Sequence, residues 1–143
     1  VQGLRMKGYE GKITAHNLFD SDPIPVDYRV IPRCTFLDPE IASIGITEAE
    51  AQAADIPYRV LRVDLADMDR SILNGSPEGL VKILVNPKEG QILGAHLIGH
   101  EVSSLIAEIA LCMQNNLPIK AIADTMHAYP SFPEAIEAAA LQF

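Results

Sequence analysis

Cysteine and basic residues are scarce in this chain, and each shortage argues against a class of function. Its 143 residues include two cysteines and no tryptophan, and 11 Lys and Arg stand against 19 Asp and Glu, for a formal net charge of −8. Because binding to phosphates needs a basic surface, this balance argues against a nucleic-acid partner and against an anionic membrane surface.

The two cysteines, Cys34 and Cys112, lie far apart in the sequence. They form no CxxC pair and no metal-type spacing. We expect Cys34 in a strand and Cys112 in a helix, both as buried, reduced thiols, because free cysteine is among the most buried residue types. A disulfide between them is an alternative that no sequence feature supports and that a cytosolic location disfavours.

Histidine is scattered, and no metal site is expected. The four histidines are His16, His96, His100 and His127. His96 and His100 are four residues apart, but Gly99 and an expected strand end between them prevent the helical ligand pair that such a spacing can give.

Long apolar runs and nucleotide-binding loops are also missing. No run of about 18 apolar residues predicts a transmembrane helix, and the first residues lack the apolar core of a signal peptide. We therefore expect a soluble, cytoplasmic protein. Neither GxGxxG nor GxxxxGK[ST] occurs, and there is no GxSxG nucleophile elbow.

What is present suits one domain with a short lead-in. Hydrophobic residues make up 48% of the chain, enough for a core at this length. Residues 4–19 look helical, and the stretch DSDPIPVD at 20–27 ends that helix with two prolines. We place a boundary near residue 27, which separates a lead-in at 1–27 from a domain at 28–143.

The domain begins with strand patterns. Residues 29–39 mix β-branched and aromatic side chains, and 41–46 is a second apolar run. Thr47 and Glu50 form a capping box that opens a short helix, which Pro57 ends. Residues 58–65 alternate as a half-buried strand does.

A hairpin and three helices follow. The apolar runs 79–85 and 91–99 flank the turn NPKEG, which predicts a hairpin. Lys82 and His96 are expected on its more solvent-exposed faces. Gly94 indicates a bulge or a close approach of another segment. Residues 101–116 repeat apolar side chains at helical spacing over most of the circumference, so a sheet and a second subunit are expected to cover this helix. Short helices follow Pro118 and Pro133. The order predicts an α+β fold, with an antiparallel sheet of about five strands flanked by helices.

The most reactive side chains gather near the end of the chain, at His127, Tyr129 and Glu134. Tyr129 precedes Pro130, which fixes the backbone in an extended direction. Ser131 and Glu134 form a second capping-box pattern. Glu134 can accept a hydrogen bond from a phenol or an imidazole, or it can simply cap its own helix. Both readings remain open at this point.

The order of motifs resembles one enzyme family over nearly the whole chain. The family is the class I pyridine nucleotide-disulfide oxidoreductases, which include dihydrolipoamide dehydrogenase, glutathione reductase and mercuric reductase. The matching stretches are GYEGKITAHNL (8–18), VIPRCTFLDPEIASIGITEAEA (30–51), EGLVKILVNPKEGQILGAHLIG (78–99), LIAEIALCMQNNLPIKAIADTMHAYP (105–130) and PEAIEAAA (133–140).

The resemblance implies a dimerisation domain of an FAD-dependent oxidoreductase. In such enzymes an FAD domain and an NAD(P)H domain precede the interface domain, so residues 1–27 would be the terminal helix of the FAD domain and its linker. That helix points its amino end at the flavin, where its dipole stabilises negative charge, and Met6 would be a flavin contact. The chain would form a homodimer. Without the FAD and NAD(P)H domains, these residues are expected to bind no cofactor and to have no activity.

The resemblance also implies active-site residues. The family's interface domain supplies an HPxxxxE dyad to the partner subunit, and here the matching positions are Tyr129, Pro130 and Glu134, with His127 two residues earlier. Histidine titrates near pH ~6.5 and tyrosine near ~10, so the replacement weighs against reduction of lipoamide or glutathione. A tyrosine at this position is similar to mercuric reductase and to the soluble transhydrogenases.

Other functions remain open from the sequence. One alternative is a non-catalytic homodimerisation module, because the nucleotide-binding and redox motifs are missing from these residues. Another is a transhydrogenase-like flavoprotein. A third is a small-molecule-binding α+β domain, which a ligand would stabilise on its own.

Overall fold

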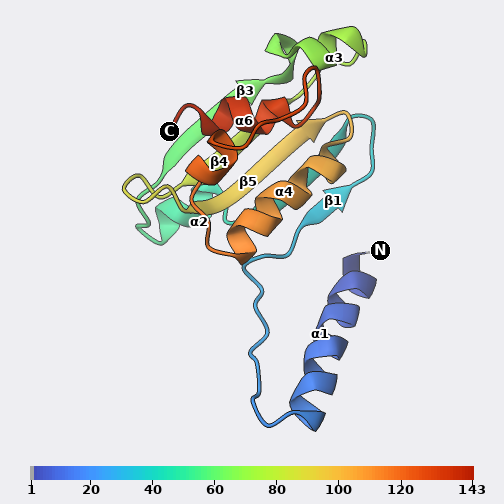
Figure 1. Ribbon diagram of the computed structural model, residues 1–143, viewed down its shortest axis with the longest axis vertical. Helices are drawn as coiled ribbons and strands as arrows, with labels where there is room; N and C mark the ends of the chain where they lie inside the picture. The colour runs from blue at the N-terminus through green and yellow to red at the C-terminus, as the bar shows by residue number, and fades with distance from the viewer. Residues whose placement is uncertain (1) are drawn as a thin grey trace.

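A five-stranded antiparallel sheet forms the centre of the molecule (Figure 1). The computed structural model describes residues 2–143, with side chains from residue 6 onward. The sheet has the order β1-β2-β5-β4-β3, and all neighbouring strands run antiparallel. The strands are β1 (Arg33–Thr35), β2 (Glu40–Gly45), β3 (Arg59–Asp64), β4 (Leu80–Val85) and β5 (Ile92–Gly99). The predicted α+β class is confirmed.

Helices surround this sheet, and one of them stands apart. They are α1 (Gln2–Phe19), α2 (Glu48–Ala53), the 3-10 turn η1 (Leu65–Asp67), α3 (Asp69–Leu73), α4 (Val102–Gln114), α5 (Lys120–Ala123) and α6 (Glu134–Ala140). On one face, α4 packs against β2 and β5, and α6 packs against β3 and β4. Figure 1 shows α1 away from these layers, joined to β1 by an extended segment.

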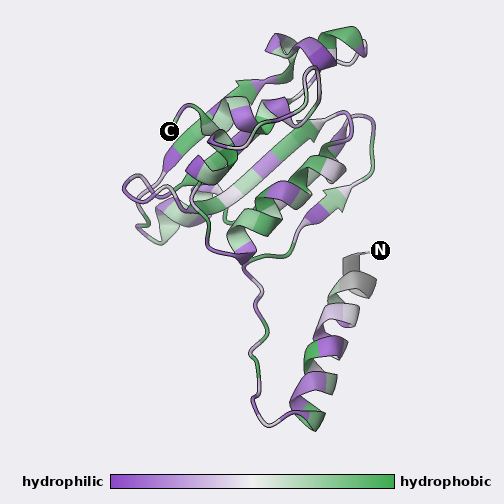
Figure 2. Cartoon of the chain, in the orientation of Figure 1, coloured by the Kyte–Doolittle hydropathy of each residue, from purple (hydrophilic) through white to green (hydrophobic). Residues whose placement is uncertain are grey.

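The core lies between the sheet and the helices α4 and α6. Leu61, Ile83 and Leu97 point into it from the strands, and Ile109 and Ile136 close it from the helices. In the view of Figure 2, hydrophobic and hydrophilic residues are mixed along α4. Burial of these side chains stabilises the fold by about 25 cal/mol per Å² of apolar surface.

The opposite face of the sheet is partly polar, as predicted for Lys82 and His96. The two residues lie directly across from each other on β4 and β5. Lys82 Nζ is 2.8 Å from Glu48 Oε1 on α2, and His96 Nε2 is 3.1 Å from the carbonyl oxygen of Ile46. The α2 end therefore covers this face through polar contacts.

Two sequence patterns are matched by local geometry. The Thr47 side chain accepts from Glu50 N while Glu50 accepts from Thr47 N, so the first capping box is confirmed. A Cβ on Gly94 would lie 2.1 Å from Ile46 O, which confirms the predicted close approach. Because the obstacle is backbone rather than a flexible side chain, only glycine fits there.

Three local predictions need correction. The strand expected over 29–39 shrinks to β1, because Pro32 has no N–H to donate and the chain turns before Pro39. The segment 66–78, left without an element in the sequence analysis, forms the end of η1 and all of α3. The second capping box is only half formed: Glu134 accepts from Ser131 N, but the buried Ser131 hydroxyl has no hydrogen-bond partner, and Pro133 occupies the N-cap position of α6.

The thiols differ in burial. Cys112 is buried in α4 as predicted, whereas Cys34 in β1 is only half-buried. No disulfide joins them. Burial raises the pKa of both thiols, and nearby Glu40 and Glu108 add to the rise at Cys34 and Cys112 respectively.

The outer edge of β3 carries an unusual side-chain contact. Gln142 lies beside Arg62, where its Oε1 accepts from Arg62 N at 3.0 Å and its Nε2 donates to Arg62 O at 2.7 Å. Arg59 Nη2 donates to the carbonyl oxygen of Gln142 at 2.5 Å. The side-chain amide thus pairs with the strand as a neighbouring strand would.

Within residues 2–143, none of the helices combines the length and the apolar character needed to span a membrane.

Candidate active site

The loop between α5 and α6, residues 124–133, carries the predicted reactive side chains. Figure 1 shows it reaching toward α3, at the end of the molecule far from α1. The side chain of Tyr129 is 74% exposed, whereas Phe132 is buried and anchors the loop. Tyr129 is therefore free to contact a second molecule.

The phenol of Tyr129 is hydrogen-bonded to a residue 60 positions away. Tyr129 Oη donates to Asp69 Oδ2 at 2.5 Å, and Asp69 is the first residue of α3. This hydrogen bond, followed by the charge of Asp69, raises the pKa of Tyr129, and the charge of Glu134 adds to the rise. The phenol therefore keeps its proton at neutral pH.

Within this loop, the side chain of His127 points inward between two carboxylates. Its side chain is only 7% exposed, with Nε2 at 3.0 Å from Glu108 Oε1 on α4. Nδ1 lies 2.9 Å from Thr125 O and 3.2 Å from Glu137 Oε2 on α6. Both ring nitrogens face oxygen acceptors, which is the arrangement that the doubly protonated imidazolium satisfies.

The balance of forces on His127 favours its charged form. Burial lowers the pKa of His127, but Glu108, through its hydrogen bond and its charge, raises it, with further help from Glu137 and the Thr125 carbonyl. The net shift is upward. A buried, charge-paired imidazolium holds α4, the loop and α6 together rather than facing a second molecule.

Glu134 serves its own helix. Its Oε2 accepts from Ser131 N at 2.6 Å, at the start of α6. The structure therefore does not join His127, Tyr129 and Glu134 in one hydrogen-bonded cluster. Of the two readings of Glu134, the capping contact is the one formed, although its charge is close enough to influence Tyr129.

Sequence reasoning did not find Asp69, Glu108 or Glu137. Asp69 is distant in sequence, and the helix that carries it has only five residues. Glu108 and Glu137 resemble ordinary polar positions on amphipathic helices, and only the packing of α4 against the loop and α6 shows that both reach His127.

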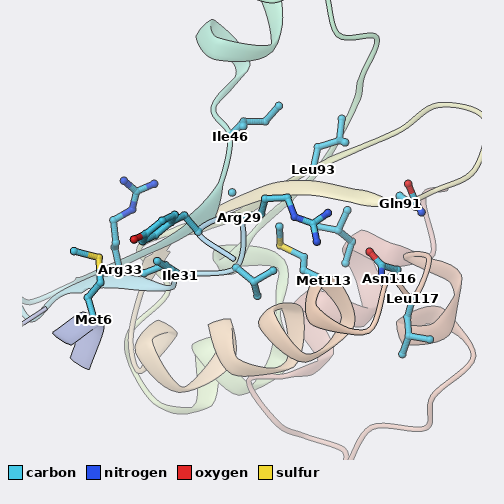
Figure 3. A pocket seen from close by; sticks show the side chains of 14 residues that line it. Met6, Arg29, Ile31, Arg33, Ile46, Gln91, Leu93, Met113, Asn116 and Leu117 are labelled. Carbon is cyan, nitrogen blue, oxygen red and sulfur yellow. The ribbon is translucent and has the colours of Figure 1, made fainter. Parts of the chain in front are cut away.

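Met6, the predicted flavin contact, lies far from this loop. It lines a cavity of about 660 Å³ between α1, the segment before β1 and the end of α4 (Figure 3). Apolar side chains such as Ile31, Leu93 and Met113 dominate the lining, and Arg33 adds a positive charge. The role of Met6 stays a prediction. Over the residues that the structure describes, no group of three His, Cys, Asp or Glu side chains is placed to hold a metal ion.

Comparison with known proteins gives a consistent pattern. The family model for the pyridine nucleotide-disulphide oxidoreductase dimerisation domain matches residues 31–140. A dihydrolipoyl dehydrogenase from Chlorobaculum parvum is 34% identical over 131 residues, which are 92% of this chain and 28% of that protein. The dihydrolipoyl dehydrogenase of Chlamydia muridarum is 33% identical over 140 residues, which are 98% of this chain and 30% of that protein.

A solved structure agrees with these relatives. LpdA from Mycobacterium tuberculosis superposes with a TM-score of 0.87 at 26% identity, and the match covers 93% of this chain and 29% of LpdA. The chain thus spans about three tenths of the length of the curated relatives that it matches.

Proposed function

Because the chain belongs to the dimerisation-domain family of the pyridine nucleotide-disulphide oxidoreductases, we propose that it is the interface domain of a homodimeric, FAD- and NAD(P)H-dependent oxidoreductase. Each copy would place Tyr129 against the redox centre of its partner subunit. The observation that carries this proposal is the 74% exposed phenol at the tip of a loop whose base is fixed by buried Phe132 and His127.

The lead-in helix fits a role beside the flavin. Met6 lies near the amino end of α1, where it lines the cavity between α1, the segment before β1 and the end of α4. We propose that 1–27 close the FAD domain and that Met6 contacts the flavin. When bound, FAD and NAD(P)H supply the redox chemistry, and the residues of this chain supply position and charge.

Tyr129 would orient the electron acceptor rather than shuttle protons. The family's histidine titrates near neutral pH, but the raised pKa of Tyr129 keeps its phenol protonated there. The relatives named dihydrolipoyl dehydrogenase make lipoamide one acceptor to test, and we propose that a small molecule other than lipoamide is the better one.

Stopped-flow kinetics of the full-length protein tests the role of Tyr129. Tyr129→Phe is expected to slow reduction of the acceptor by at least about tenfold while flavin reduction by NAD(P)H stays within about twofold. Tyr58→Phe is the matched control, because that phenol instead accepts a hydrogen bond from Gln52 Nε2 at 2.7 Å. Two unchanged half-reactions in Tyr129→Phe would remove Tyr129 from the active site.

The absorbance spectrum of the full-length protein separates this proposal from its non-catalytic rival. Flavin bands are expected. A full-length protein that dimerises without any bound flavin would instead be a homodimerisation module.

A further inference from the structure

Two neighbouring side chains of α3 hold the loop that carries Tyr129. Asp69 accepts the phenol hydrogen bond, and the guanidinium carbon of Arg70 lies 5.5 Å from the centre of the Phe132 ring. Both contacts join positions about 60 residues apart in the sequence. A short helix with no catalytic residue of its own is thus attached to the active-site loop at two points.

The helix that holds Asp69 is itself anchored. Ser71 is fully buried, and Leu65, just before α3, is buried in the core. Met68 N donates to Leu65 O at 3.1 Å, which ties the start of α3 to η1. The buried Ser71 and the hydrogen bond to η1 therefore hold one side of α3, whereas Ile72 and Leu73 on that helix stay exposed.

The direction of the hydrogen bond follows from the chemistry of the two groups. An ionised carboxylate can only accept, so the Tyr129 hydroxyl must donate its proton to Asp69. The lone pairs of the phenol oxygen are then left for another molecule. Because Tyr129 is 74% exposed, that molecule can reach them.

We propose that Asp69 is a positioning residue. It accepts the hydrogen bond from the Tyr129 hydroxyl, so that the phenol oxygen is oriented to accept a hydrogen bond from a molecule at the partner's redox site. This inference rests on the proposed function. The electron acceptor that fits this arrangement is a molecule that offers a hydrogen-bond donor or a positive charge to the phenol oxygen. Protons consumed in its reduction come from a source other than Tyr129.

A titration of the full-length protein tests the pairing directly. Tyrosine labelled with ¹³C at Cζ reports each phenol by NMR, and Tyr129→Phe assigns the signal. Asp69→Asn is expected to lower the pKa of Tyr129 relative to the wild type, because it removes the leading cause of the upward shift. Asp67→Asn, which removes the same charge from an exposed residue of η1, is expected to leave the titration unchanged.

Kinetics tests whether the pairing matters. Asp69→Asn is expected to slow acceptor reduction on the order of tenfold, and the double variant with Tyr129→Phe is expected to be no slower than Tyr129→Phe alone. Asp69→Glu should restore part of the rate and of the upward pKa shift. Melting temperatures confirm that each variant is folded.

The outcomes separate this inference from the function beneath it. Any of three results would overturn the role of Asp69. The pKa of Tyr129 could be the same in Asp69→Asn as in the wild type, or Asp69→Asn could reduce the acceptor at the wild-type rate. The double variant could also be slower than Tyr129→Phe by the full factor that Asp69→Asn causes on its own. If Tyr129→Phe itself leaves both half-reactions unchanged, the proposed function fails, and the titration still decides whether Asp69 holds the phenol.

Discussion

At the scale of single residues, His127 shows how a reactive side chain can be used for architecture. Its ring is buried between Glu108 on α4 and Glu137 on α6. Burial alone would favour the neutral ring, but two carboxylates at hydrogen-bond distance reverse that preference. The charged ring in turn links α4, the loop and α6 through its contacts with Glu108 and Glu137.

The stability of the chain is therefore expected to depend on pH through His127. A pKa raised by folding adds stability that is complete below the unfolded value, about 6.5, and is lost as the pH rises through the folded value. Compared with His127→Gln, the wild type should show its largest gain in melting temperature between about pH 5 and 6.5, shrinking above that range.

Thermal melts of both proteins over pH 5–9 measure this gain. Glu108→Gln keeps the size of the side chain but removes its charge, so it should lower the pKa of His127 and shift the loss of stability to lower pH. A gain that grows as the pH rises would contradict the charged state assigned to His127.

The reactive residues were only partly predictable from the sequence. The pattern of Tyr129, Pro130 and Glu134 pointed to the loop of the proposed site, where Tyr129 is exposed, and the roles of these residues stay predictions. The hydrogen-bond partners were not predictable, because Asp69 comes from an element 60 residues away. Local patterns report local contacts, and the phenol's contact depends on the tertiary fold.

At the scale of elements, the strongest periodic patterns were predicted correctly. The hairpin of β4 and β5 and the helix α4 match their expected ranges within a few residues, because each buries a regular apolar face. The strand β1 was predicted too long, and the short helix α3 was not predicted. Their bounds depend on prolines and on packing against neighbours, and neither one has a periodic pattern of its own.

Helix α4 offers a matched pair of substitutions. Ile109 is fully buried against the sheet, whereas Leu111 is 63% exposed on the outer side, where we propose that the second subunit packs. Ile109→Asp is expected to destabilise the domain by about 4 kcal/mol or more, because it buries a charge and removes core contacts. Leu111→Glu is expected to change stability by less than about 0.5 kcal/mol but to weaken self-association.

Chemical denaturation and light scattering on the full-length protein distinguish the two effects. The Leu111→Glu protein should dissociate at higher concentrations than the wild type does while it unfolds at nearly the same denaturant concentration. Unaltered dimer mass on dilution would show that the outer side of α4 lies outside the interface.

At the scale of the whole molecule, α1 is attached mainly through its own linker. The hydrogen bonds of Tyr9, His16 and Asn17 all reach the segment 22–28. Ile13 is buried, yet it is not part of the main core cluster. The boundary near residue 27 stays a prediction.

Removal of residues 1–27 therefore tests the domain boundary. The remaining chain, 28–143, is expected to melt cooperatively within about 5 °C of the intact chain, because the sheet, α4 and α6 keep their contacts. Circular dichroism melts provide the measurement. Loss of a cooperative transition would mean that α1 belongs to the same folding unit.

The contact between Gln142 and β3 has a consequence for how copies of this protein meet in solution. Unpaired strand edges recruit other strands and seed fibrils. Here a single amide occupies the hydrogen-bonding groups of Arg62 on that edge. The Gln142 side chain, just after α6, thereby blocks a strand of another copy from pairing with β3 at Arg62.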